Sequence, residues 1–363
     1  MKALITAVIP TYKRPQWLKR AVYSVLRQSY ADFEILIADN ASGEETDDMT
    51  AVLLQQDKRI KLLKHPTNIG AIANFQAALA QVSTPYVCFL PDDDFFAPFF
   101  FAETVPLFDS HPDIAFCGGG GVKIDEQYVV SAITANHPFI PSSGYYAPPQ
   151  GLFAYLRSSF AIVFPSLLFK TQILHEIGGF DLRIRNGADE HLISQCAVRY
   201  PIYLITERPF YFGFQHPGSL SLQIDYALFA NEADRLHENL LAAPLAQHEK
   251  EEVNRFFLKR KQKILSSAYR HFCSLKHFKE AHAYADRLYS LSPSFNWKRR
   301  RLQASLYSYL PQLAALYNQG RAFEQWLRKG SSQKLQADQQ ISSIPHPEAS
   351  FLQDYARSLA DTW

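Results

Sequence analysis

Three consecutive aspartates, Asp92, Asp93 and Asp94, directly follow a short apolar run at residues 86–90. Adjacent carboxylates repel one another, so a cation is their natural counterweight. Mg²⁺ and Mn²⁺ prefer oxygen ligands and are often held by one or two carboxylates together with the phosphates of a substrate. If the segment is extended, Asp92 and Asp94 point the same way and can share a task, while Asp93 faces elsewhere. The acidic run therefore predicts a site for Mg²⁺ or Mn²⁺, with a solvated turn as the alternative.

A second polar pair, Asp39-Asn40, also ends an apolar run, which covers residues 33–38. A carboxylate in this position can accept an N–H hydrogen bond from a nucleobase. The alternative is an Asx turn or a helix cap, which both residue types favour on local grounds. The pair is therefore a candidate nucleotide-binding element.

The loop at residues 66–70 precedes a predicted helix at 71–82 and contains Asn68 and Gly70. The free N–H groups at a helix start, and the positive end of its dipole, attract anions such as phosphate. Simple capping of the helix by Asn68 is the alternative.

Asp189 and Glu190 stand at the start of a predicted helix over residues 190–199. An acid at the mouth of the sheet can act as a general base and remove the proton from an attacking hydroxyl. The alternative is capping by Asp189, with Glu190 favouring the helix dipole. His216 follows a predicted strand at 210–214 and can ligate a metal or contact a phosphate. His191 is more typical of an ordinary core or surface histidine.

The elements that must position these side chains alternate between two periodicities. Apolar runs typical of buried strands alternate with segments of helical spacing, a pattern that predicts a parallel, doubly wound α/β sheet. In such sheets ligands bind at the carboxyl ends of the strands, where the polar residues above are found. The predicted strands cover 4–9, 33–38, 60–63 and 86–90, and the predicted helices cover 15–28, 44–56 and 71–82.

The pattern changes twice further along the chain. Residues 114–214 are less regular, with short strands predicted at 114–117, 128–133, 202–205 and 210–214 and loops at 138–149 and 180–189. From residue 222 helical periodicity dominates, with helices predicted at 225–243, 246–275, 277–291 and 298–318, the last one interrupted by Pro311. We therefore predict a catalytic domain at 1–221, with a nucleotide-binding half at 1–117 and an acceptor-binding half at 118–221. A helical region at 222–330 and a flexible tail with a terminal helix at 331–363 would follow.

Composition excludes several classes of protein. The formal net charge of +2 over 363 residues gives no footprint for nucleic-acid binding. The four cysteines form no Cys-x-x-Cys pair, which favours a reducing compartment. The apolar N-terminus is too short for an export signal, and no run is long enough to span a bilayer. We expect a cytoplasmic protein or one attached to the inner face of the cell membrane.

One segment suggests how such attachment would occur. The basic run 298–301 is followed by apolar residues at helical spacing, which resembles a basic amphipathic helix. These apolar residues are Leu302, Leu306, Tyr309, Leu310, Leu313 and Leu316. The alternative is a helix packed on the catalytic domain with a solvated basic end.

Six motifs in this order resemble the family 2 glycosyltransferases, whose fold is called GT-A. The matching stretches are 8–15, 24–30, 33–42, 68–70, 89–94 and 178–181, and the resemblance covers residues 1–220. It implies a GT-A domain that uses a divalent metal and a nucleotide-sugar, typically a UDP-sugar. It also implies transfer to a hydroxyl of a glycan or lipid-linked acceptor with inversion, most often in bacterial surface polysaccharide or lipopolysaccharide synthesis.

The resemblance also implies a role for each matching residue. Asp39 would bind the base, Asp92 would lie near the ribose, and Asp93 or Asp94 would reach the metal. Asp189 would be the catalytic base, and His216 would approach the diphosphate or the metal. The remaining nucleotide-binding residues would be Pro10, Thr11, Tyr12, Arg14, Asn68 and Gly70.

Two departures from the family pattern leave details open. Pro91 stands where the family often has an aspartate, so the pair that forms the Asp-x-Asp motif is not fixed. Ala188 stands where the family often has glutamate, so Glu190 competes with Asp189 for the role of base. A nucleotidyltransferase is an alternative function, but it should carry a glycine-rich loop after the first strand, where Thr11–Pro15 has none. A non-catalytic nucleotide-binding scaffold of the same fold is the other alternative.

Overall fold

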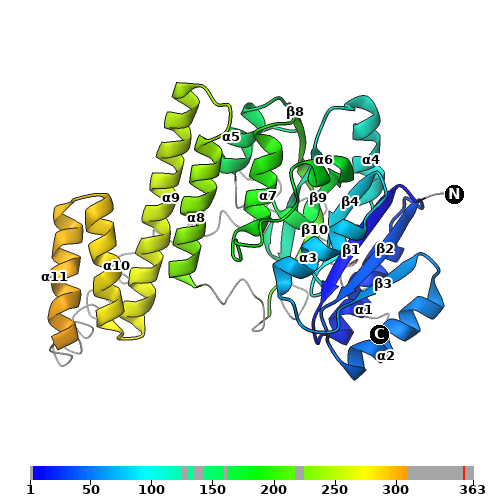
Figure 1. Cartoon of the computed structure of the whole chain (residues 1–363), viewed down its shortest axis with the longest axis horizontal. Helices are drawn as coiled ribbons and strands as arrows, with labels where there is room; N and C mark the ends of the chain where they lie inside the picture. The colour runs from blue at the N-terminus through cyan, green and yellow to red at the C-terminus, as the bar shows by residue number, and fades with distance from the viewer. Residues whose placement is uncertain are drawn as a thin grey trace. The chain divides into compact units, whose positions relative to one another are not determined.

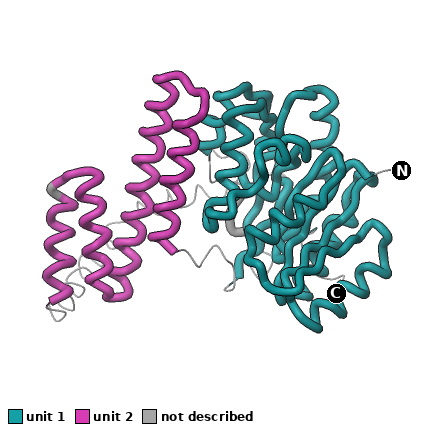
Figure 2. The backbone as a smooth tube through the Cα atoms, viewed as in Figure 1, with its two compact units in different colours: residues 1–223, 346–363 teal, residues 224–345 magenta. Residues whose placement is uncertain are grey.

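The computed structural model describes residues 3–124, 130–133, 142–158, 162–216, 225–309 and 355. The chain divides into two compact units, which Figure 2 shows in separate colours. The first, here called the sheet unit, consists of residues 1–223 and 346–363, and the second, the helical unit, consists of residues 224–345.

The first half of the sheet unit has the predicted alternation of strands and helices (Figure 1). Four parallel strands lie side by side in the order β3-β2-β1-β4. The predicted parallel α/β sheet is therefore confirmed. The elements are β1 (Ile5–Thr11), α1 (Pro15–Leu26), β2 (Phe33–Asp39), α2 (Glu44–Gln56), β3 (Ile60–Lys64), α3 (Ala71–Gln81) and β4 (Tyr86–Phe89).

The second half extends the same sheet beyond β4 in the order β9-β6-β10-β5. β9 runs antiparallel to both of its neighbours, so the complete sheet is mixed but mainly parallel. β7 pairs with β6, and β8 pairs with β10. The elements are β5 (Phe95–Phe96), α4 (Phe100–Ser110), β6 (Phe116–Ile124), β7 (Val130–Ile133), β8 (Gly144–Tyr146), α5 (Gln150–Arg157), η1 (Phe164–Ser166), β9 (Leu167–Lys170), α6 (Thr171–Glu176), α7 (Ala188–Ala197) and β10 (Ile202–Phe214).

Two boundaries differ from the sequence prediction. The short strand predicted at 114–117 begins later, at Phe116, and continues as β6 through the glycine run at 118–121. Its neighbours come too close for side chains, because a Cβ on Gly119 would lie 1.8 Å from the carbonyl oxygen of Ile205. The two short strands predicted at 202–205 and 210–214 are one strand, β10, whose register shifts around Pro209. A proline before an apolar run resembles a break in the sequence, but here it sits at an irregularity in the ladder.

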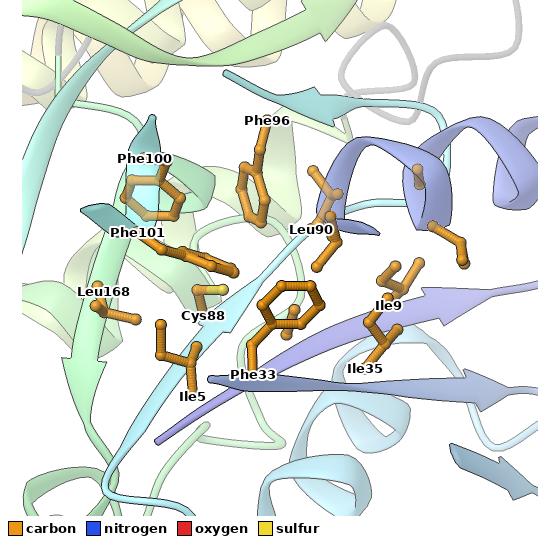
Figure 3. Close-up of a cluster of buried hydrophobic side chains, with 14 of the residues drawn as sticks. Ile5, Ile9, Phe33, Ile35, Cys88, Leu90, Phe96, Phe100, Phe101 and Leu168 are labelled. Carbon is orange, nitrogen blue, oxygen red and sulfur yellow. The ribbon is translucent and has the colours of Figure 1, made fainter. Parts of the chain in front are cut away.

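Apolar side chains fill the space on both faces of this sheet. Figure 3 shows the larger cluster, in which side chains of β1 and β2 gather with Phe96, Phe100 and Phe101. Helix α1 adds Leu18, Val22 and Val25 to this cluster, and further members come from other strands of the sheet. On the other side, Phe75 of α3 packs against Phe89, with ring centroids 5.8 Å apart, and against Phe180 at 5.5 Å. The strands are thus buried on both faces, which is why their sequences are continuously apolar.

The helical unit consists of α8 (Tyr226–Leu241), α9 (Gln247–Ser274), α10 (Phe278–Leu291) and α11 (Phe295–Tyr309). Each helix packs against the next along the chain. Small and aliphatic residues form its core, among them Ala268, Ala285, Leu288 and Ala304. Across the described ranges, none of the helices combines the length and the apolar character needed to cross a bilayer. Residues 310–318 of the last predicted helix, with Pro311, and the tail except Tyr355 lie outside the described residues.

Candidate active site

Three strand ends meet at one edge of the sheet, as the sequence predicts. Thr11 at the end of β1 is paired in register with Asp39 at the end of β2. The N–H of Asn40 donates to the carbonyl of Thr11 over 3.0 Å, which holds the two ends together. Asp92 follows β4, which pairs with β1 on the opposite side. The polar residues singled out in the sequence are therefore neighbours in space.

The acidic run is a turn rather than an extended segment, since the N–H of Asp94 donates to the carbonyl of Pro91 over 3.1 Å. The expectation that Asp92 and Asp94 face the same way and share one task is wrong. In a turn successive side chains do not alternate as they do in a strand. Each of the three carboxylates instead has its own set of partners.

Asp92 faces β1. Its Oδ2 accepts a hydrogen bond of 2.7 Å from Thr11 Oγ1, and its Oδ1 lies 3.3 Å from Arg14 Nη1. Burial, and then the charge of Asp93, raise the pKa of Asp92 to about 6, although Thr11 and Arg14 act in the opposite direction. Burial disfavours the charged form of a carboxyl group, and the negative charge of Asp93 next to it acts in the same direction.

Asp94 faces β10 and is buried. Tyr211 donates to its Oδ2 over 2.6 Å, and the N–H of Phe214 donates to its Oδ1 over 2.8 Å. Burial, followed by the charge of Asp93, raises its pKa well above the usual range. Gly121 leaves room for the Tyr211 ring, because a Cβ there would lie 2.7 Å from Tyr211 Cδ1. Asp94 thus attaches the acidic turn to β10.

Asp93 is the aspartate that meets side-chain nitrogens from two directions. Its Oδ2 lies 2.9 Å from Arg14 Nη1 and 3.0 Å from His216 Nε2. The centroid of the His216 ring lies 4.1 Å from that of Trp17 in α1, and the two rings are tilted by 44°. The predicted proximity of His216 to the acidic run is therefore present in the structure.

Arg20 of α1 was not singled out in the sequence, yet it is central to this arrangement. It is 5% exposed and donates to the backbone carbonyl of Asp93. Its guanidinium lies 4.2 Å over the Phe214 ring, so it joins the turn to the end of β10. The sequence offered one indication of its role, because Arg20 lies on the buried stripe of α1 together with Ser24 and close to Trp17.

The end of β2 contains Asp39, which is 2% exposed and accepts from the N–H of Ser42 over 3.2 Å. This is the Asx-type contact named as the alternative for this residue. The Asn40 amide is also used internally, since it donates to Asn68 Oδ1 over 3.0 Å and accepts from the N–H of Ile69 over 2.9 Å. These bonds pin the loop at 65–70 to the end of β2.

Tyr12 lies on the solvent side of this loop and is 40% exposed. A hydrogen bond with Asn68, and then one with Lys13, lower the pKa of its phenol. Gly70 has a φ of 87°, which favours glycine, and there is open space around its Cα. Pro10, the residue before the last one of β1, is paired with Ala38 of β2. An exposed aromatic ring, a buried acid and an open loop end thus lie next to one another.

The start of α7 brings a further acid to the site. Asp189 is exposed, whereas Glu190 and His191 are buried, with exposed fractions of 8% and 7%. Gly187 is the N-cap of α7, so the capping alternative for Asp189 does not apply. Burial raises the pKa of Tyr211, and the charges of Asp94, Asp93 and Asp189 add to this effect. Asp189 therefore lies within electrostatic range of the hydroxyl that binds Asp94.

The donor atoms at the acidic turn suit a partly open metal site. Within the part of the chain that is described, no group of three or more His, Cys, Asp or Glu side chains is arranged to hold a metal by itself. Mg²⁺ and Mn²⁺ commonly take few protein ligands and complete their shell with substrate phosphates and water. The Asp93 carboxylate and the His216 imidazole fit such a site, because both are accepted ligands of Mn²⁺.

Comparisons with known proteins agree with this fold. Residues 6–169 match the family described as Glycosyl transferase family 2. An Escherichia coli protein, UDP-Glc:alpha-D-GlcNAc-diphosphoundecaprenol beta-1,3-glucosyltransferase WfgD, is 34% identical over 91 residues, which cover 25% of this chain and 35% of that protein. The chain spans about half the length, or less, of the first curated relatives it matches.

Two solved structures share the fold at low sequence identity. Residues 1–349 of Staphylococcus aureus TarS, in complex with UDP-GlcNAc, superpose with a TM-score of 0.58 at 17% identity, over 84% of this chain and 79% of that one. The mannosyltransferase PcManGT from Pyrobaculum calidifontis, in complex with GDP-Man and Mn²⁺, gives a TM-score of 0.53 at 14% identity, over 99% and 86%. Residues 6–169 thus match Glycosyl transferase family 2, and the chain shares its fold with these GT-A-like structures.

Proposed function

We propose that the protein transfers a sugar from a nucleotide-sugar, with UDP-sugar as the favoured donor, to a hydroxyl of a glycan or lipid-linked acceptor. The observation that carries this proposal is the meeting of three groups at one sheet edge. Asp39 and Tyr12 lie at the ends of β2 and β1, Asp93 contacts His216, and Asp189 lies within electrostatic range of Tyr211, so we assign these groups to the base, the cation and the acceptor in turn. Transfer of a sugar needs three functions: recognition of the donor's base, neutralisation of its diphosphate and activation of the acceptor hydroxyl.

The nucleotide end suits a uracil ring. Asp39 can accept an N–H from the base, and the exposed Tyr12 offers an aromatic face beside it. The loop at 68–70 is held against β2 by Asn40, so its backbone N–H groups are fixed at the start of α3. Thr11, Arg14 and Asp92 would then flank the ribose and the phosphates. Pro10 shapes the wall of this pocket at the end of β1.

Of the three aspartates, Asp93 is our choice as metal ligand, together with His216. Asp94 is already bound by Tyr211 and the backbone of Phe214, and Asp92 by Thr11. When bound, Mg²⁺ or Mn²⁺ would stabilise the charge that develops on the diphosphate leaving group. Arg14 contacts the Asp93 carboxylate and so neutralises it while no metal is present.

Asp189 is our choice as the general base, in preference to the buried Glu190. The acceptor hydroxyl gives its proton to Asp189, and its oxygen attacks the anomeric carbon from the face opposite the diphosphate. The bond from that carbon to the phosphate oxygen breaks, and the nucleoside diphosphate leaves with the electron pair. A single displacement of this kind inverts the configuration at the anomeric carbon.

The acceptor named for one relative supports a proposal for where in the cell this reaction takes place. WfgD is named for a diphosphoundecaprenol acceptor, which is a lipid-linked glycan. We therefore place this reaction at the inner face of the cell membrane, in the assembly of bacterial surface polysaccharide or lipopolysaccharide.

The test compares Asp189→Asn with Glu190→Gln. Asp189→Asn should lower the transfer rate by about 1000-fold or more, since loss of a general base typically costs two to four orders of magnitude. Binding of UDP with Mn²⁺, measured by calorimetry, should remain within about twofold of the wild type. Transfer that survives in Asp189→Asn but is lost in Glu190→Gln would reassign the base.

A screen of UDP-, GDP- and dTDP-sugars for hydrolysis and transfer defines the donor. Release of a nucleoside diphosphate supports a glycosyltransferase, whereas release of pyrophosphate would support the nucleotidyltransferase alternative. An absence of metal-dependent UDP binding by the wild type would favour the non-catalytic scaffold.

A further inference from the structure

Basic residues are concentrated in residues 255–309, which belong to the helical unit. Residues 255–309 contain 13 lysines and arginines but only two acids, Glu280 and Asp286, although the whole chain has a net charge of only +2. Arg255, Lys259 and Lys263 are exposed at intervals of four residues along α9. Such a stripe faces one side of a helix and creates a positive potential over it. Residues 255–309 are therefore suited to a negatively charged partner.

Helix α11 presents a different pattern on its outer side. Lys298, Arg299, Leu302, Leu306 and Tyr309 are all exposed, with exposed fractions of 60%, 47% and 81% for the three apolar residues. At 3.6 residues per turn their side chains fall within a stripe about 100° wide. We call this stripe the outer face of α11. It combines two cations at its beginning with a large apolar surface along the rest of its length.

The opposite side of α11 accounts for the packing of the helix. Ala304 is 1% exposed in the core of the unit, and Arg301 lies 2.9 Å from Asp286 of α10. Arg300 lies 4.8 Å over the Trp297 ring. The residues that stabilise α11 are thus separate from those of the outer face, whose exposed Leu and Tyr side chains cost hydrophobic free energy when they stay in water.

We propose that the outer face of α11 lies on a lipid bilayer that contains anionic headgroups. The cations match the negative charge of the lipid surface, and the leucines and the tyrosine match the boundary between headgroups and acyl chains. A soluble acidic partner would use the cations alone and leave the apolar side chains unexplained. The stripe on α9 adds to the positive potential of the helical unit, which attracts an anionic surface at longer range.

This inference rests on the proposed function only for its purpose, because a surface that binds lipid would bring the enzyme to a lipid-linked acceptor. The binding itself is measured without any donor or acceptor. The full chain is mixed with vesicles made of equal parts phosphatidylglycerol and phosphatidylcholine, and with vesicles of phosphatidylcholine alone, and the bound fraction is measured by flotation. The wild type should bind the anionic vesicles at least about tenfold more strongly.

Two variants separate the charge of the face from its apolar surface. Lys298→Glu/Arg299→Glu should lower binding to anionic vesicles by about tenfold or more. Leu302→Asn/Leu306→Asn should remove the part of the binding that survives about 0.5 M salt, since only electrostatic attraction is screened. Circular dichroism checks that both variants keep the helical content of the wild type.

The matched control is Lys58→Glu/Arg199→Glu, which changes the net charge by the same amount at exposed positions of the sheet unit. It should bind anionic vesicles as the wild type does, and equal loss in both charge variants would overturn the proposal. If the chain binds soluble polyglutamate but not vesicles, and the leucine variant binds polyglutamate equally well, the face would be assigned to an acidic protein instead. A dimer that dissociates in the leucine variant would assign it to a second copy of the chain.

The failure of this inference is distinguishable from failure of the proposed function. Transfer to a short, water-soluble acceptor should be equal in the wild type and in Lys298→Glu/Arg299→Glu. Vesicle binding without any transfer activity would refute the proposed function alone.

Discussion

The sheet unit and the helical unit treat charge in opposite ways. In the sheet unit Asp39, Asp92, Asp94, Arg20 and Glu190 are buried, and most of them lie near the carboxyl ends of the strands. In the helical unit Glu232 is the single fully buried charged residue among residues 225–309. Residues 1–224 are slightly acidic, with 17 basic and 21 acidic residues, whereas residues 225–309 hold 15 basic and nine acidic ones.

The difference reflects two uses of the same residue types. Buried charges are expensive, so a protein keeps them where partners or ligands compensate them, as they do around the acidic turn. Exposed charges cost little and act at a distance on other charged bodies. The sheet unit therefore resembles a reaction site, and the helical unit resembles a binding surface. The following predictions test this contrast, starting with the largest effect.

Gly119→Ala should destabilise the sheet unit by about 3 kcal/mol or more, because the added Cβ would meet the carbonyl of Ile205 at 1.8 Å. Calorimetry should show a lower melting temperature for the sheet unit, while the melting temperature of the helical unit stays unchanged. Leu288→Ala, in the core of the helical unit, should do the reverse at a cost of about 2–5 kcal/mol. Transitions that always shift together would show that the two units unfold as one.

Asp93→Asn should weaken Mn²⁺-dependent binding of UDP by about 100-fold, because it removes the charge of the proposed metal ligand. Calorimetric titration of UDP with and without Mn²⁺ measures the effect. Asp48→Asn, at an exposed position of α2, is the matched control and should bind as the wild type does. Full retention of binding in Asp93→Asn would move the metal to another aspartate of the turn.

Arg14→Gln should raise the affinity for Mn²⁺ without nucleotide by roughly fivefold, since Arg14 competes with the metal for the carboxylates. Its Nη1 lies 2.9 Å from Asp93 Oδ2 and 3.3 Å from Asp92 Oδ1. The free Mn²⁺ signal in electron paramagnetic resonance gives the affinity. Lys13→Gln loses the same charge one residue away and should have a smaller effect. Weaker Mn²⁺ binding in Arg14→Gln would mean that the arginine organises the site rather than competing in it.

Arg301→Gln should change the stability of the helical unit by less than about 1 kcal/mol, because exposed ion pairs contribute little. Its side chain and that of Asp286 are 41% and 43% exposed. The thermal transition of the helical unit is the measurement. A large loss would show that the basic residues of α11 serve packing, which would weaken the contrast between the two units.

The order of strands and helices could be predicted because it depends on local patterns. Apolar runs buried on both faces of a sheet, and helices with one apolar stripe, each have a periodicity that the sequence displays directly. The strand ends followed from the same patterns, and with them the meeting of Thr11, Asp39 and Asp92. The family resemblance agreed with this order, and the match of residues 6–169 confirms it.

Where β-strand patterns failed, the cause was contact between distant segments. The strand predicted at 114–117 stops before the glycines of β6, where the backbones of Ser166 and Ile205 leave no room for a Cβ on Gly118 and Gly119. β5, with only two residues, is held by β10 and has no pattern of its own.

What the sequence determined by itself is an acidic run at the end of a buried strand, beside the polar ends of two neighbouring strands and ahead of a second acid at 189. Only the tertiary structure decided which partners each aspartate contacts. Asp94 bonds to Tyr211, 117 residues away, and Asp93 meets His216 at a distance of 123 residues. The direction of a side chain in a turn depends on which partners the fold brings to it, and no local period records such partners.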